Sequence, residues 1–192
     1  MRPLAVHAAF TLGVLAALVA VVPSAVAETK PVQLALFSPA QVFPPETDIV
    51  GVRLDLLYGK NHNVVGLDWG LVNHSTGFGA GWQLGGVGYV EGAFVGWQDN
   101  VVNLTRGTFT GFQSGLVNHA ASTTAAFQLG AVNHGGTVVG FQLGWVNVTD
   151  SMNGLQIGAL NWTKQMRGLQ IGIGNIIEKG RFPFLPVVNF QM

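Results

Sequence analysis

From Gly51 onward, apolar and polar residues alternate in short segments that are separated by polar, turn-forming residues. The segment from Gly154 to Asn161, "GLQIGALN", shows the pattern: Gly, apolar, Gln, apolar, Gly, two apolar residues and Asn. Alternation with a period of two is typical of a β-strand, because neighbouring side chains of a strand point to opposite faces. The pattern predicts an all-β fold in which each strand has one face of large apolar residues and one face of Gly and Gln.

The segment recurs every fifteen residues and, later, every fourteen residues along the chain. Its first positions are Gly51, Gly66, Gly81, Gly96, Gly111, Ala126, Gly140, Gly154 and Gly168. One more step reaches a degenerate unit that starts at Phe182 and keeps Asn189 in the eighth position. Regular self-similarity of this kind marks a repeat architecture. It predicts a repeat β domain of ten units over residues 50–192.

Two polar columns run through the units. The third position is Gln in seven of them: Gln83, Gln98, Gln113, Gln128, Gln142, Gln156 and Gln170. The eighth position is mostly Asn and precedes turn-forming residues. Because the third and fifth positions share one face of a strand, we expect an inward Gln column beside the small residues of the fifth position.

Two architectures accept such strands, and the favoured one is an antiparallel β-barrel of about ten strands of the outer-membrane type. A unit of 14–15 residues divides into a strand of about 9–11 residues and a short turn, which matches a transmembrane strand. The apolar column would then face lipid, and the Gln column would fill the lumen. The chain also ends in alternating Val188, Phe190 and Met192, similar to the terminal strand of such barrels.

The alternative architecture is a β-solenoid in which each unit forms one coil and the Gln and Asn residues stack into ladders. Two observations count against it. The large Trp69, Trp97 and Trp145 would crowd a narrow solenoid core. A soluble solenoid should also carry a charged surface, whereas charged residues make up only 9% of this chain.

The N-terminus has the pattern of a secretory signal peptide over residues 1–27. Arg2 precedes an apolar run, and small residues at Ala25 and Ala27 form an A-x-A cleavage site. An uncleaved membrane anchor is the alternative, since the run is long enough to span. Residues 28–49 form a Pro-rich lead-in segment, for which we expect a strand near 32–37. The chain has no Cys, which excludes disulfides and thiolate metal sites.

Composition also indicates where the protein is located and which partners to expect. The net charge is zero, which gives no reason to expect a nucleic-acid partner. An exported, charge-poor β chain is expected at the outer membrane or cell surface of a Gram-negative-type bacterium. The expected partners are outer-membrane lipid and the barrel assembly machinery; a small-molecule or protein ligand stays open.

The candidate site residues are few. Arg53, Asp55 and Asp68 share the inward face of the first two units, and we expect a polar cluster in the lumen. It is either a constriction or ion path, or an ion pair that holds the barrel together, and we favour the ion pair. His74, His119 and His134 follow the eighth position. A barrel would put His119 and His134 at opposite rims, and only a solenoid would stack them, so we expect turn residues and no metal site.

The units "GLQIGALN" and "GLQIGIGN" resemble the tandem GLQIGLVN-type repeats of exported bacterial surface-repeat-containing proteins. The resemblance covers essentially the whole mature chain, including its ending "PFLPVVNFQM". It implies an exported surface protein, and it brings no catalytic or cofactor-binding residue with it.

The expected function follows from these points. The turns carry no Ser-His-Asp set and no close pair of carboxylates, so we expect no enzymatic activity, no catalytic residue and no cofactor. The chain is expected to be an outer-membrane or surface repeat protein with a structural or narrow-pore role. The alternative is a soluble, surface-exposed β-solenoid that binds a partner along its Gln and Asn face.

Overall fold

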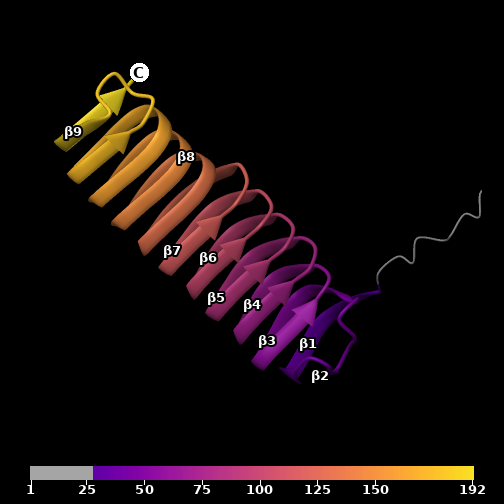
Figure 1. Cartoon of the computed structure of the whole chain (residues 1–192). Helices are drawn as coiled ribbons and strands as arrows, with labels where there is room; N and C mark the ends of the chain where they lie inside the picture. The colour runs from indigo at the N-terminus through magenta and orange to yellow at the C-terminus, as the bar shows by residue number, and fades with distance from the viewer. Residues whose placement is uncertain (1–27) are drawn as a thin grey trace, which may run out of the picture.

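The computed structural model describes residues 28–192 and shows a β-solenoid, in which successive coils stack along one axis (Figure 1). The predicted signal peptide, residues 1–27, lies outside the described residues. The strands are β1 (Thr29–Phe37), β2 (Ala40–Gln41), β3 (Asp48–Asn61), β4 (Val64–Ser75), β5 (Gly79–Val90), β6 (Phe94–Thr105), β7 (Phe109–Ala120), β8 (Thr124–Ile177) and β9 (Phe184–Gln191). The long β8 runs without a break through the four coils that begin at Ala126, Gly140, Gly154 and Gly168.

The barrel prediction is wrong, because neighbouring coils pair in parallel and in register. Gly66 lies opposite Gly81, and Gln83 lies opposite Gln98. The sheet runs from β2 to β9 and does not close on itself. Alternation alone cannot separate the two folds, since both need one inward and one outward face. The barrel assembly machinery was expected as a partner only because a barrel was predicted, so this expectation no longer has support.

The three Trp residues that argued against a solenoid do not enter its core. Trp69, Trp97 and Trp145 point outward and are 59%, 43% and 74% exposed. The interior is filled instead by the small and polar columns of the repeat. The narrow cross-section is therefore no obstacle to a solenoid.

Eight of the nine regular units begin with glycine, which the close approach of neighbouring coils favours, and Ala126 takes this place in the sixth. The first-position glycines have φ between +109° and +145°, a region that side chains rarely adopt. A Cβ added at Gly111 would also overlap the carbonyl oxygen of Gly96 in the preceding coil. Only parallel stacking brings one first position onto the next, so this column is itself a product of the solenoid.

The fifth and eighth positions form a second matched set. Asn147 donates one hydrogen bond to the Asn161 side chain, at 2.8 Å, and one to the backbone oxygen of Ile157, at 2.9 Å. A Cβ at Gly158 would lie 2.6 Å from the Asn147 amide nitrogen. Gly at the fifth position thus leaves the space through which Asn of the preceding coil reaches the next coil.

The Gln and Asn columns form two buried ladders of opposite polarity. Each Gln amide donates to the Gln of the preceding coil, from Gln170 back to Gln83, at 2.6–2.9 Å. Each Asn amide from Asn103 to Asn161 donates to the Asn of the following coil, at 2.8 Å. The two rows of amide dipoles therefore oppose one another along the axis. Apolar residues enter the interior chiefly as two small clusters, one around Phe109 and one around Met152.

The two ends of the solenoid differ from its coils. At the N-terminal end, β1 pairs in parallel with β3, and the Pro-rich lead-in thus contributes the first strand of the stack. At the C-terminal end, β9 pairs antiparallel with the last coil, so the tenth unit reverses direction. Asn189 remains buried there and donates to the backbone oxygens of Asn175 and Phe182. Among residues 28–192, no helix is long and apolar enough to cross a membrane.

Candidate functional site

The predicted polar cluster exists and lies completely inside the first two coils. Arg53 holds Asp68 through two hydrogen bonds, at 2.7 and 2.8 Å, and donates a third to the backbone oxygen of His74. Asp68 also accepts a hydrogen bond from Gln83, at 2.9 Å, and so begins the Gln ladder. Arg53 is 0% exposed, and Asp55 and Asp68 are 5% and 4% exposed, so the cluster is almost completely shielded from solvent. Its geometry is that of an ion pair within a packed interior.

Asp55 is the member of the cluster with incomplete partners. Its Oδ2 lies 3.1 Å from the Arg53 Nε, but that N–H donates to Asp68, and neither Asp55 oxygen accepts a hydrogen bond. Burial raises the pKa of Asp55 to about 7; Arg53 opposes the shift, and Asp68 adds to it. Protonation of Asp55 leaves one cation and one anion in the cluster, which is the neutral combination that a buried site favours.

The Gln and Asn columns are closed to partners. The seven Gln side chains of the ladder are at most 1% exposed, and the Asn side chains of the eighth position are 0–1% exposed. The expectation that a partner binds along a Gln and Asn face is therefore wrong, because these side chains are buried and hydrogen-bond to each other. Any surface that binds a partner consists of the outward positions.

The outward side chains of the second, fourth and sixth positions form what we call the apolar face. In the nine regular units these are 27 positions, three per unit, and only Asp99 among them is ionisable. Asp99 accepts a hydrogen bond from Ser114, the neighbouring polar residue on this face. Members that are 36–77% exposed are Leu56, Trp69, Leu71, Trp82, Trp97, Val101, Leu116, Phe127, Leu143, Trp145, Ile171 and Ile173.

The apolar face is not flat, because it carries packed aromatic rings and a groove. Trp82 and Trp97 stack with ring centroids 5.4 Å apart, and Phe112 meets Trp97 edge-on at 5.4 Å. Near the N-terminal end, where Gly86 interrupts the sixth-position column of large side chains, lies an apolar groove of about 690 Å³. It is lined by leucines of β1, β3, β4 and by Trp69. The groove is continuous with the apolar face and is part of it.

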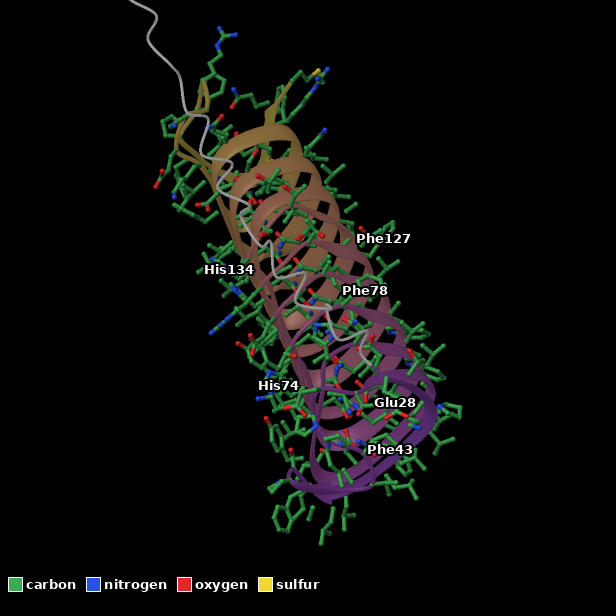
Figure 2. The ribbon with its side chains drawn as sticks, turned by 90° about the vertical axis from the view of Figure 1, so that its right-hand side faces the viewer. Glu28, Phe43, His74, Phe78, Phe127 and His134 are labelled. Atoms are coloured by element: carbon green, nitrogen blue, oxygen red, sulfur yellow. The ribbon has the colours of Figure 1, made fainter. Side chains whose placement is uncertain are left out.

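The ninth and eleventh positions form the opposite surface, which we call the polar edge. Its Asp, Glu, Lys, Arg and His members are Lys60, His62, His74, Glu91, Arg106, His119, His134, Asp150, Lys164 and Glu178. Lys60 and His62 belong here because the first coil has one extra residue after Asp55, so that Lys60 pairs with His74. Figure 2 shows Phe127 of the apolar face and His134 of the polar edge projecting from opposite sides of the solenoid. Ionisable side chains are therefore nearly absent from the apolar face and gather on the polar edge, which also carries apolar residues at the ninth position, namely Leu104, Val148, Trp162 and Ile176.

One hydrogen-bonded chain on the polar edge joins three coils. The Tyr58 hydroxyl lies 2.7 Å from Nδ1 of His74, and Nε2 of His74 lies 2.9 Å from Glu91. Burial lowers the pKa of His74, although Glu91 opposes the shift, and burial raises the pKa of Tyr58. A raised phenol pKa is the reverse of what a tyrosine nucleophile needs. We therefore interpret this series of hydrogen bonds as a structural link between coils.

Comparison of the chain with family models, with curated proteins and with solved structures finds no match. The candidate surfaces thus rest on the residues and geometry of this chain alone.

Sequence reasoning identified the buried cluster and the Gln column but missed the role of the outer columns. It assigned the large apolar residues to lipid contact around a barrel, whereas the structure gathers them on one side of a solenoid. It also separated His119 from His134, whereas the structure stacks their rings with centroids 4.8 Å apart. The fifteen-residue spacing of these two histidines was the signal that they share one position in neighbouring coils.

Proposed function

We propose that this chain is a non-enzymatic, exported repeat protein of the bacterial envelope that lies on a lipid surface and binds it through the apolar face. The observation that carries the proposal is the near absence of ionisable groups from the 27 positions of that face, while ten Asp, Glu, Lys, Arg and His residues occupy the polar edge. The resemblance to exported surface-repeat proteins supports an envelope location, and membership of that family is part of the proposal.

The exposed area of the apolar face needs an occupant. Soluble monomers rarely expose continuous apolar patches larger than a few hundred Å². The ladder spacing of about 4.8 Å per coil gives the nine coils of this face a length of roughly 40 Å. Twelve large apolar side chains that are more than a third exposed over this length form a patch typical of a binding surface.

Lipid fits this face better than a protein partner does. A protein interface of ordinary size carries about ten direct hydrogen bonds. The apolar face offers almost none, because its two polar residues, Asp99 and Ser114, bond to each other. Its backbone groups are paired with neighbouring coils, so contact with hydrocarbon leaves no unsatisfied donor or acceptor there.

The separation of surfaces also suits an orientation parallel to the membrane. Interfacial elements bury an apolar side in the boundary between headgroups and acyl chains and keep a charged side in water. Trp residues, which prefer this boundary, occur on the apolar face at Trp82, Trp97 and Trp145. Because the net charge is zero, we expect binding to neutral lipid and weak dependence on salt.

The test is flotation of the full chain with vesicles of phosphatidylcholine. We expect the wild-type chain to float with the vesicles, and a Leu116→Lys, Trp145→Lys variant to stay in the dense fraction. The matched control is Ala121→Lys, which adds a charge at an exposed eleventh position and should still float.

Two outcomes would contradict the proposal. Flotation of the Leu116→Lys, Trp145→Lys variant at the wild-type level would show that the apolar face is not the contact. A dimer in sedimentation without lipid, lost in the same variant, would assign the face to a second copy of the chain instead.

A further inference from the structure

His119 and His134 occupy the ninth position of neighbouring coils and lie side by side on the polar edge. They are paired in register between β7 and β8. Their rings are nearly parallel, with an interplanar angle of 19° and centroids 4.8 Å apart. The two Nδ1 atoms are 2.8 Å apart. Parallel stacking thus brings two metal-ligating nitrogens within reach of one ion.

The other two imidazoles of the described chain have partners of a different kind. His62 pairs with Asp48 at 2.9 Å, and His74 lies between Tyr58 and Glu91. Among residues 28–192, the side chains of His119 and His134 hydrogen-bond only to each other and form no ion pair. A single proton occupies the space between their Nδ1 atoms, so one imidazole donates and the other accepts.

We propose that His119 and His134 bind one divalent transition-metal ion, with Cu²⁺ preferred over Zn²⁺. A metal–nitrogen distance of about 2.0–2.1 Å places two ligands at 90° about 2.9 Å apart, and two tetrahedral ligands about 3.4 Å apart. The observed separation of 2.8 Å is the length of the hydrogen bond between the two rings, and only a small adjustment brings both nitrogens to one ion. Imidazole affinity for divalent ions also peaks at Cu²⁺.

Binding needs a tautomer change in one ring. The donating imidazole moves its proton from Nδ1 to Nε2, after which both Nδ1 lone pairs face the ion and no net proton is released. No group of three or more metal-ligating residues exists in the part of the chain that the structure describes. Water therefore fills the remaining coordination positions, and the ion exchanges readily.

The backbone beneath the pair is rigid enough to hold the two rings. Asn118 and Asn133, one residue before each His, are buried and joined by a 2.8 Å hydrogen bond in the Asn ladder. The two β-strands are also paired on both sides of the histidines. Ligands on paired strands keep their spacing better than ligands on loops. The site stands apart from lipid binding, because it lies on the polar edge.

The test is titration of the full chain with CuCl₂ by calorimetry, followed by electron paramagnetic resonance of the bound Cu²⁺. We expect one ion per chain at this site, with coupling to two nitrogens. His119→Ala and His134→Ala should each weaken Cu²⁺ binding by about 100-fold or more. Loss of a residue that only hydrogen-bonds to a metal ligand typically costs about 10- to 100-fold, and loss of a ligand itself should cost at least the upper value. In the double variant, the further loss of Cu²⁺ affinity should be no larger than the loss caused by removing one nitrogen ligand.

His62→Ala is the matched control, because it removes an exposed imidazole of the polar edge without touching the pair. We expect it to bind Cu²⁺ like the wild type, and ZnCl₂ to bind the wild type more weakly than CuCl₂. A second measurement uses the unaltered chain: Cu²⁺ should broaden the imidazole NMR signals of His119 and His134 before those of His74. Unchanged affinity in the single variants, or equal broadening of all imidazole signals, would overturn the proposal.

Discussion

Phe127 and Gln128 are neighbours in the chain, yet Phe127 is 57% exposed and Gln128 is fully buried. The same contrast holds between the Gln column and the apolar face along the solenoid. In most soluble domains the apolar side of a strand faces the core and the polar side faces water. Here amides satisfy each other inside a stack of identical coils, so the interior tolerates polar groups and the apolar side is free to contact another phase.

The interior depends on complete pairing, whereas the apolar face does not. A buried polar group that loses its partner costs the full desolvation of that group, about 1–3 kcal/mol. An outward apolar side chain that is already exposed loses little when it is replaced. The two regions should therefore respond to substitution in opposite ways: the interior through stability, and the apolar face through binding.

The largest effect is expected for Arg53→Met. The substitution leaves Asp68 buried without its cation and beside Asp55, and breaking a buried ion pair in this way typically costs about 3–5 kcal/mol. We expect a clear fall in the midpoint of thermal unfolding, measured by circular dichroism. Arg106→Met on the polar edge is the control and should change the midpoint little; equal midpoints for both variants would contradict the buried cluster.

A smaller effect of opposite sign is expected for Asp55→Asn. Because burial raises the folded-state pKa of Asp55 to about 7, the folded protein holds a proton that the unfolded chain loses near pH 4. The wild type should therefore lose stability as pH rises from about 4 to about 7, on the order of 3 kcal/mol, and level off above that. Asp55→Asn lacks this loss.

The measurement is the difference in unfolding midpoint between wild type and Asp55→Asn at pH 5 and at pH 8. We expect the variant to gain on the wild type at the higher pH. A difference that is the same at both pH values would show that Asp55 is not held in its neutral form.

The Gln ladder can be compared directly with the apolar face. Gln128→Leu removes the acceptor of Gln142 and the donor to Gln113, and it should cost about 1–3 kcal/mol in the free energy of unfolding. Leu116→Gln makes the reverse change on the apolar face and should cost less than about 0.5 kcal/mol. Urea unfolding of both variants measures the pair, and a larger cost for Leu116→Gln would break the contrast.

The sequence alone predicted an all-β fold of tandem repeats, the inward Gln column and the inward cluster of Arg53, Asp55 and Asp68. It could not decide the stacking, because alternation has the same form in a barrel strand and in a solenoid coil. The first-position column did contain the answer. Gly is needed there only if the carbonyl of Gly96 meets Gly111 in the next coil, which antiparallel neighbours do not provide.

An exception to the repeat held a second clue. Gly88 stands where the third unit should have Asn, and Asn100 stands where the fourth unit should have Gly. In the structure these two irregularities compensate, because a Cβ at Gly88 would lie 2.4 Å from the amide nitrogen of Asn100. Asn100 in turn donates to Asn103 at 2.7 Å. The two irregularities have a common cause only if neighbouring coils are parallel. In contrast, no pattern in one sequence reveals what covers the apolar face.

The most direct test of the parallel stack is the distance between spin labels attached to cysteines at positions 56 and 173 of the full chain, measured by pulsed dipolar spectroscopy. The chain has no native Cys, and Leu56 and Ile173 are both exposed sixth-position residues. Eight coil steps of about 4.8 Å predict a separation of roughly 38 Å, apart from the length of the labels. In a closed antiparallel barrel of ten strands, the same positions lie two strands apart, so a distance near 10 Å would contradict the solenoid.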